Sequence, residues 1–468
     1  MTTVNASKST DDLGVKSVGK LIAQYSVPAI IASVATSLYN IIDSIFIGRG
    51  VGPMAIAGLA ITFPLMNLVA AFCVLIAAGG ATIVSIFLGQ KNYKRAVDVV
   101  NNVFTLCLIH SIVFGGLTLL YLEPILMFFG ATTETVGYAK EFMEVILIGT
   151  PVGYVFIGLN NIMRATGYPR KAMVSALISV VVNLIFAPIF IFVFDWGIRG
   201  AAMATICGQF SAFVWVLSHF LSRKSSIHFQ FGGRWLSGGI IKRIYAIGLS
   251  PFLMNVCGCV VVIFINRALL DYGGSDGNFA VGAYGILNRT AMFFVMVVFG
   301  VTQGMQPILG YNIGANNFGR VKQVLSLGVR IGVAITFVGW IVCETMPDNV
   351  SSLFTTDQDL IRIARDGFRY YFIAFPVVGC QIVIQNFFQS VGKPNMSIFL
   401  SLTRQLLFLI PFLIVFPRFW GVKGVWASMA CSDVIAFVVA VVTLWWWMRN
   451  SMSRMEANAA RMAEQSGR

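Results

Sequence analysis

The segment GQKNYKRAVDVV (residues 89–100) has a second copy later in the chain, GANNFGRVKQVL (residues 314–325). The two segments share a glycine at the first position, an asparagine at the fourth, an aromatic residue at the fifth and an arginine at the seventh. The same offset in numbering also pairs NNIMRATGYP (160–169) with QNFFQSVGKP (385–394). A gap-free match over about 80 positions indicates that one unit has been used twice.

The composition places both copies of this unit in a membrane. Of 468 residues, 57% are hydrophobic and only 11% are charged, whereas a soluble domain carries about 25% charged residues. Apolar stretches long enough to cross a bilayer recur along the whole chain. They lie near residues 21–47, 55–88, 98–121, 138–160, 172–194, 198–221, 244–270, 279–311, 323–346, 369–391, 397–416 and 424–448. The sequence therefore predicts an all-α polytopic membrane protein with twelve transmembrane helices in two six-helix repeats.

The lysine and arginine residues predict the orientation of these helices. Loops on the side of the N-terminus, with the two tails, hold 21 basic residues, whereas the opposite loops hold four: Arg49, Arg199, Arg418 and Lys423. This bias predicts that both termini lie in the cytoplasm. Because each half has an even number of spans, the two repeats are parallel, related by an axis along the membrane normal.

The repeat predicts five parts. They are a cytoplasmic tail (1–20), an N-lobe of six helices (21–221), a cytoplasmic linker (222–242), a C-lobe of six helices (243–448) and a second cytoplasmic tail (449–468). Two like bundles can leave a cleft between them that opens to each side in turn, which is the geometry of a transporter. The alternative is that the duplicated bundles pack into a closed structure.

Several other function classes lack their residues. The formal charge of +14 lies in loops on one membrane side, so it does not indicate a nucleic-acid partner. GVKSVGK (14–20) matches a phosphate-binding loop only up to its lysine, because Leu21 follows where a Ser or Thr is needed. We therefore expect no nucleotide, and an ion gradient as the energy source. The Cys and His residues lack metal-ligand spacing, and no catalytic groups cluster, so we expect neither a metal or other cofactor nor an enzyme.

One acid interrupts the first apolar helix, in LYNIIDSIFIG (38–48). Asp43 there costs about 2.5–3.5 kcal/mol if it lies near the middle of the bilayer. Tyr39 and Asn40 lie four and three residues before it, on the same helix face. Burial disfavours the charged form of a carboxylate, so Asp43 could exchange a proton or bind Na⁺. The alternative is that Asp43, near the predicted outer end of its helix, extends toward water.

Further polar residues in the first half could line a site with Asp43. They are Asn161, Asn183, Thr205 and Gln209. In the second half, Arg404 and Asp433 lie in the last two helices without partners nearby in sequence, so we predict that they form a structural ion pair. Gln209 occupies the position that matches Asp433, so this pair belongs to the second half alone.

The combination of motifs resembles one transporter family. LYNIIDSIFIG, GPMAIAGLAITFPLM (52–66), MRATGYPRKAM (163–173) and PILGYNIGANNFGRV (307–321) resemble the multidrug and toxic compound extrusion (MATE) transporters, above all their bacterial MepA-like branch. The resemblance covers nearly the whole chain. It implies a V-shaped pair of six-helix lobes that exports bulky organic cations in exchange for H⁺ or Na⁺.

The resemblance also implies roles for individual residues. Asp43 would be the coupling carboxylate, with Asn183 and Thr205 as polar partners. The family's N-x-x-x-D-P stretch reads NLIFAP here (183–188), so Ala187 stands where a second acid is expected. A single-acid site fits proton exchange better than a charged Na⁺ cage. A second-lobe site with acids in the seventh and tenth helices is not expected, since those spans offer only Asp271 at an extreme end.

Together these features predict a secondary active multidrug exporter of the bacterial cytoplasmic (inner) membrane. We expect a monomer in the lipid bilayer whose cleft holds small organic cations against aromatic and methionine side chains, Phe63 and Met66 among them. A flippase for a lipid-linked precursor is the alternative, although it should line its cleft with Arg and Lys for phosphate. A passive channel would differ by flux without gradient coupling.

Overall fold

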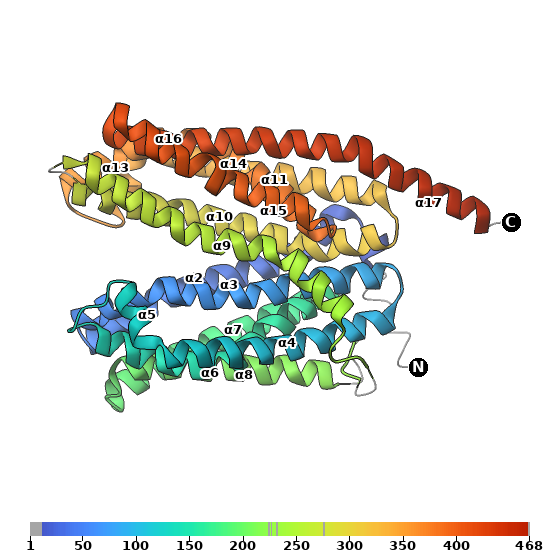
Figure 1. The fold of residues 1–468 in the computed structure, drawn as a ribbon, viewed down its shortest axis with the longest axis horizontal. Helices are drawn as coiled ribbons and strands as arrows, with labels where there is room; N and C mark the ends of the chain where they lie inside the picture. Colours follow the sequence, from blue (N-terminus) through green and yellow to red (C-terminus); the bar gives the residue numbers. More distant parts are fainter. Residues whose placement is uncertain (1–11, 223–224, 226, 231–232, 275–276, 467–468) are drawn as a thin grey trace. The chain divides into compact units, whose positions relative to one another are not determined.

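The computed structural model describes residues 12–466, apart from 223–224, 226, 231–232 and 275–276 (Figure 1). Parts of both predicted tails and of the predicted linker therefore lie outside the described residues. Within the described residues the regular structure is helical and contains no strand, which confirms the all-α fold class.

Six long helices make up the first half of the chain, and each is long and apolar enough to cross a membrane. They are α2 (Val18–Gly50), α3 (Pro53–Gly89), α4 (Tyr93–Leu120), α6 (Val136–Ala165), α7 (Pro169–Pro188) and α8 (Gly197–Leu221). A short helix, α5 (Leu122–Phe128), precedes α6, and the π-helical segment η1 (Ile189–Val193) continues α7. A proline in the first turn of α3 and of α7 suits the helix start, where a backbone N–H has no partner to lose.

The second half repeats this order with more interruptions. Its elements are α9 (Gly238–Tyr272), α10 (Gly277–Gly314), α11 (Phe318–Thr345), α12 (Pro347–Ser352), α13 (Gln358–Tyr371), η3 (Phe372–Ala374), α14 (Phe375–Ser390), α15 (Pro394–Leu402), η4 (Thr403–Leu409), α16 (Ile410–Trp447), η5 (Met448–Met452) and α17 (Ser453–Ser466). Eleven described stretches are apolar enough to cross a membrane, but the last one, Pro394–Ala459, has 66 residues, enough for more than one crossing. Gly421 breaks it with φ 56° and ψ −136°, so the predicted twelve crossings are confirmed.

The repeat extends to unusual backbone conformations. Lys91 and Asn316, which occupy matching positions in the two copies, both adopt a left-handed conformation, with φ of 55° and 56°. Gly197 and Gly421 do the same with φ of 55° and 56°. Such angles are uncommon for residues with a side chain, so their recurrence at matching positions shows that the duplicated sequence encodes a duplicated backbone.

Contacts divide the chain into two compact units whose boundaries differ from the predicted lobes. Unit 1 holds Val27–Phe252 with the described residues up to Lys16, and unit 2 holds Ser17–Ser26 with Leu253–Arg468. The boundaries thus fall inside α2 and α9, next to Pro28 and Pro251. The predicted lobes follow the repeat in the sequence, whereas the units follow contacts.

Close backbone approaches at glycines explain this division. A Cβ atom at Gly248 of α9 would lie 1.7 Å from the Leu75 carbonyl oxygen of α3, so only glycine fits there. The first part of α9 is thereby packed into unit 1. Within unit 2, a Cβ atom at Gly304 of α10 would lie 2.6 Å from the backbone nitrogen of Ser26, which packs the start of α2 there. Small residues at such crossings let membrane helices approach closely.

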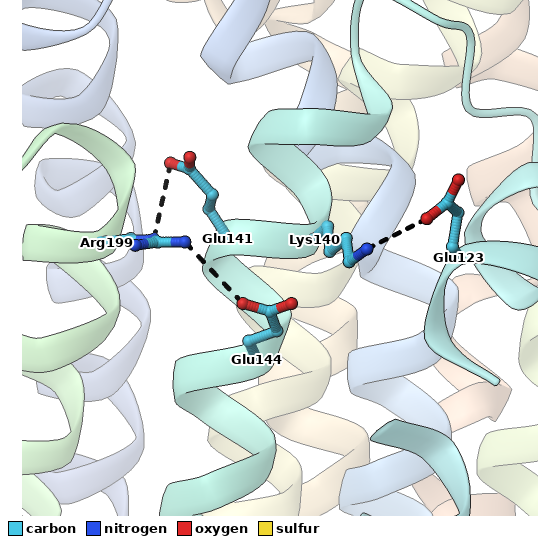
Figure 2. A network of polar contacts seen from close by, with 5 residues as sticks. All are labelled: Glu123, Lys140, Glu141, Glu144 and Arg199. Atoms are coloured by element: carbon cyan, nitrogen blue, oxygen red, sulfur yellow. Dashed lines mark hydrogen bonds and ion pairs between the residues drawn. The ribbon is translucent and has the colours of Figure 1, made fainter. Parts of the chain in front are cut away.

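Within unit 1, α6 packs against α3, α4 and α8, and ion pairs near its first turns fix its end (Figure 2). Lys140 Nζ lies 3.0 Å from Glu123 Oε2 on α5. Arg199 of α8 lies 3.8 Å from Glu141 and 3.9 Å from Glu144 (Figure 2). These pairs are partly exposed, so each contributes little to stability.

Unit 2 contains the counterpart of one of these pairs. Arg365 and Asp348 occupy the positions that match Lys140 and Glu123 in the repeat, and Arg365 Nε donates to Asp348 Oδ1 at 2.7 Å. The charges keep their positions although the residue types differ. The repeat therefore preserves the way in which the short helix is attached to the next span.

A buried polar contact joins α6 and α7 at their connecting turn. Asn160 Nδ2 donates to the Ala172 carbonyl oxygen at 3.0 Å and to Ser175 Oγ. In unit 2 the counterpart Gln385 donates from Nε2 to Ser401 Oγ at 2.7 Å. Each unit thus uses one amide to hold the same pair of consecutive helices together.

We expect Asn160→Ala to lower the thermal midpoint of the detergent-purified protein, corresponding to about 1 kcal/mol. Hydrogen bonds between membrane helices contribute ~0.6 kcal/mol on average and up to ~1.7 kcal/mol. The control is Asn161→Ala, because the Asn161 amide donates to Ile157 O within its own helix at 2.9 Å. Equal losses in the two variants would show that the contact between α6 and α7 adds nothing of its own.

Candidate functional site

Asp43 lies inside unit 1 and is covered by protein. It belongs to the last two turns of α2, and only 8% of it is exposed. Its Oδ1 atom is buried and receives no hydrogen bond from the described residues. The carboxylate therefore does not extend into water in this structure, and one of its oxygens is left for a ligand.

The Thr205 hydroxyl group of α8 organises the polar residues around this carboxylate. Asn183 Nδ2 of α7 donates to Thr205 Oγ1 at 3.1 Å, and Thr205 Oγ1 donates to the Ala201 carbonyl oxygen at 3.2 Å. The Tyr39 side chain also hydrogen-bonds Thr205 and lies within the electrostatic field of Asp43, one turn further along α2. A hydroxyl group offers one donor and two acceptor positions, and two of these three are taken by the Ala201 carbonyl oxygen and the Asn183 amide.

This arrangement leaves two oxygen atoms without donors. They are Asp43 Oδ1 and Asn183 Oδ1, both buried and both without a hydrogen-bond partner among the described residues. A buried acceptor without a donor costs about 1–3 kcal/mol. A proton held on Asp43, or a small cation with oxygen ligands, would remove part of that cost.

The described residues of this group offer few oxygen ligands for a caged metal cation. A hard cation such as Na⁺ prefers several oxygen ligands. Ala187, one turn after Asn183 on the same helix, is buried and supplies no ligand. Thr205 already uses its hydroxyl hydrogen and one of its two acceptor positions. Asp43 is therefore the single charged group of the site.

The other predicted cleft residues lie elsewhere in unit 1. Asn161 donates to its own helix, and Gln209 of α8 packs against Gly153 of α6, where a Cβ atom would lie 2.5 Å from Gln209 Oε1. Phe63 is 66% exposed. Asn40 is exposed and Met66 is half-buried. Tyr39, Asp43, Asn183 and Thr205 form one group, and the cleft role of the remaining residues stays a prediction.

Unit 2 holds the second buried charged group of interest. Arg404 Nε donates to Asp433 Oδ1 at 2.6 Å, so the structure brings the two predicted partners together. The Asp433 side chain is 3% exposed and that of Arg404 is 27% exposed. Tyr284 and Tyr371 lie within electrostatic reach of the guanidinium group. Arg404 is the second residue of the π-helical segment η4, which widens the helix locally.

Asn266 is a site residue that the sequence analysis missed. Its offset from Asp43 equals the offset between Pro28 and Pro251, so it is the counterpart of Asp43 in unit 2. Its Oδ1 atom is buried and receives no hydrogen bond from the described residues. The offset between Pro28 and Pro251 would have identified Asn266 from the sequence alone. The same position is thus acidic in unit 1 and neutral in unit 2.

Comparison with known proteins decides the family. The model of the MatE family matches residues 28–189 and 246–415, one match in each half of the chain. The chain belongs to the MatE family. Its membership accounts for the two repeats and for a multi-pass membrane protein.

Relatives with names agree with this MatE assignment. The multidrug export protein MepA of Staphylococcus haemolyticus (strain JCSC1435) is 26% identical over 431 residues, which cover 91% of this chain and 93% of MepA. A solved structure of the MATE multidrug transporter DinF-BH is 33% identical, covers 92% of this chain and 96% of that one, and has a TM-score of 0.85. An outward-facing MATE transporter of the MOP superfamily is 22% identical over 95% and 98% of the two chains, with a TM-score of 0.87, and supports the fold alone.

We expect Arg404→Met to destabilise this MatE protein strongly, because it leaves Asp433 as an unpaired buried charge. Breaking a buried ion pair costs about 3–5 kcal/mol, whereas replacing both partners by apolar residues is often neutral. The double variant Arg404→Met/Asp433→Leu should therefore recover most of the thermal midpoint lost in the single variant. A double variant as unstable as Arg404→Met would mean that each side chain has separate essential contacts.

Proposed function

We propose that this MatE-family protein is a secondary active exporter that exchanges organic cations for protons, with Asp43 as the coupling carboxylate. The observation that carries the proposal is the buried Asp43 Oδ1 atom without a hydrogen-bond donor among the described residues, in the same polar group as Tyr39, Asn183 and Thr205. The printed names of MepA and DinF-BH, a multidrug export protein and a multidrug transporter, support the substrate class.

The chemistry of a single buried carboxylate explains how such an exchange can work. In the neutral form, the Asp43 hydroxyl hydrogen can satisfy a nearby acceptor, and the site carries no charge. In the charged form, the carboxylate is an isolated anion in a protein interior, which a cationic substrate stabilises. Because one carboxylate cannot serve a proton and a cation at once, the two ligands compete. Competition at one group is sufficient to couple their movements in opposite directions.

The location and assembly of the protein are part of the same proposal. We place it in the bacterial cytoplasmic membrane with both termini in the cytoplasm, on the strength of its basic loops. It would act as a monomer, export small organic cations and require no nucleotide. The flippase alternative needs several unpaired cations along its path. Arg267 and Arg404 do not suit that role, since each lies beside an acid, Asp271 and Asp433.

The first test uses purified protein in sealed liposomes loaded with a fluorescent organic cation. We expect a pH gradient to drive transport and a Na⁺ gradient to drive none, and Asp43→Asn to transport no faster than protein-free liposomes. The control is Asp195→Asn, which removes an exposed acid of unit 1 and keeps a residue that tolerates its left-handed φ of 52°. Transport driven by Na⁺, or full activity of Asp43→Asn, would falsify the single-carboxylate proton mechanism. If neither gradient moves the dye, the flippase becomes the better description.

A second test concerns the hydroxyl group that orders the site. We expect Thr205→Val to leave the Asn183 amide without its acceptor, which costs about 1–3 kcal/mol for a buried donor. Its proton-driven transport should fall well below that of Thr205→Ser, which keeps the oxygen atom. The measurement is the initial transport rate in liposomes with matched protein content. Equal rates for valine and serine would show that the hydroxyl group has no part in coupling.

A further inference from the structure

The segment between α8 and α9 is held on one face of α4 by buried side chains. Asp98 Oδ1 accepts a hydrogen bond from Arg234 N at 3.0 Å. Asn102 Nδ2 donates to Arg234 O at 2.8 Å, and Asn102 Oδ1 accepts from Ser237 N at 2.8 Å. Asn101 Nδ2 donates to Gln230 O at 3.1 Å. The described part of this linker therefore has a fixed path over unit 1 although it is not helical.

Aromatic side chains support the same path. The Trp235 ring stacks on Phe229 with centroids 6.0 Å apart and an interplanar angle of 9°. Both rings also contact Phe104 of α4 edge-on. These contacts add buried apolar area to the hydrogen bonds, so the linker reaches the start of α9 in a defined position.

This path brings cations from three segments to one end of unit 1. The turn between α3 and α4 together with the first turn of α4 carries three of them, the linker carries one and the first turns of α9 carry two. We call these six residues the basic cradle: Lys91, Lys94, Arg95, Arg234, Lys242 and Arg243. All six are exposed.

Two arginines of the basic cradle share one aromatic ring. Arg95 Cζ lies 5.9 Å from the centroid of Phe87, and Arg243 Cζ lies 5.3 Å from the same centroid. Phe87 is buried, so both guanidinium groups rest on a fixed surface. Cation–π contacts of this kind hold like charges near each other without a carboxylate between them.

The charge of the basic cradle is not neutralised within the part of the chain that the structure describes. None of its six side chains forms an ion pair with a carboxylate there. The acid on the adjacent turn of α4, Asp98, accepts a backbone N–H of the linker. The cradle therefore presents positive charge that no described acid neutralises, which suits it to bind an anion from outside the chain.

Membrane orientation alone does not explain this concentration of charge. The positive-inside rule places basic residues on one side of the membrane. It gives no reason for them to gather in one of the two units. The repeat supplies the comparison, because five cradle positions have counterparts at the same end of unit 2. These counterparts are Gly19, Lys20, Asn316, Gly319 and Arg320, of which two are basic. Unit 1 has basic residues at all five of these positions. Three of the five cations are therefore found in unit 1 and have no basic counterpart at the matching positions of unit 2.

We propose that the basic cradle binds the phosphate group of an anionic phospholipid. Guanidinium groups bind phosphate oxygens through two parallel hydrogen bonds, and lysines add point charges around them. The cradle lies at the ends of membrane-spanning helices, where lipid headgroups are found. Tyr93 and Leu236, which are 39% and 60% exposed, lie next to its cations in sequence and suit the interface with the acyl chains.

A lipid phosphate at this position would join the turn between α3 and α4 to the first turns of α9. It would balance two arginines that otherwise repel each other across Phe87. Basic pockets between membrane helices bind phospholipid headgroups in this way. The inference does not depend on the direction of transport, on its substrate or on Asp43.

The test measures lipid binding by the purified full-length protein in detergent. Phosphatidylglycerol or phosphatidylcholine with the same acyl chains is titrated in, and native mass spectrometry counts the bound lipid. We expect the wild type to prefer phosphatidylglycerol, and Arg95→Gln/Arg243→Gln to bind it roughly tenfold to thirtyfold more weakly, since each basic residue near a headgroup strengthens binding roughly fivefold. Phosphatidylcholine binding should stay unchanged.

The control is Arg449→Gln/Arg454→Gln, which removes two exposed arginines from unit 2, one of them 5.6 Å from the ring of Trp445. It should keep the preference for phosphatidylglycerol. No preference in the wild type, full binding by the cradle variant or an equal loss in the control would each overturn the proposal. If the arginine variant has a lower thermal midpoint in phosphatidylcholine, Lys94→Gln/Lys242→Gln takes its place with the same expected direction.

A final arm separates a lipid from a soluble phosphate compound. Inorganic phosphate is added to the wild-type complex with phosphatidylglycerol. We expect it to displace the lipid only at a large molar excess, because it lacks the acyl chains. Displacement at equal concentration would assign the cradle to a soluble phosphate and overturn its assignment to a lipid.

Discussion

A polar group inside a membrane-spanning bundle has no water beside it, so it must find its partner within the protein. Most polar groups of this chain do. Asn160 binds the next helix, and Arg404 binds Asp433. Among the buried side-chain atoms that lack a partner in the described part of the chain, the Asp43 oxygen is the one that belongs to an acid. A buried carboxylate without a donor costs more than a neutral amide in the same position, and a proton or a cation would remove part of that cost.

The fold was predictable because its signals are periodic and repeated. The twelve apolar stretches and the constant offset between the two copies needed only the sequence, and Gly421 shows that the break in the last apolar stretch falls where the sequence predicted two separate spans. The division into compact units was not predictable in the same way. It depends on how closely Gly248 approaches Leu75, and a glycine in sequence does not reveal which backbone lies against it.

The candidate site was predictable in its members and not in its bonding. Asp43 attracted attention as an acid in an apolar helix, and Asn183 and Thr205 followed from the family resemblance. That Thr205 accepts from Asn183 and donates to the Ala201 carbonyl oxygen depends on how α7 and α8 pack, which sequence spacing does not reveal. The linker escaped prediction for a similar reason. Asp98 and Asn102 bind backbone groups of a segment without any period.

Duplication makes the differences between the halves informative, because matching positions began with the same residue. Asp43 corresponds to Asn266, and Gln209 to Asp433, so each of these two buried acids has a neutral amide at the matching position of the other half. The acid of unit 2 is neutralised by Arg404, whereas that of unit 1 has no cation beside it among the described residues. A cation beside an acid favours its charged form, and burial without a cation favours its neutral form. Under the proton-exchange mechanism proposed above, the two halves would have diverged into one bundle with a paired charge and one bundle whose charge can be exchanged.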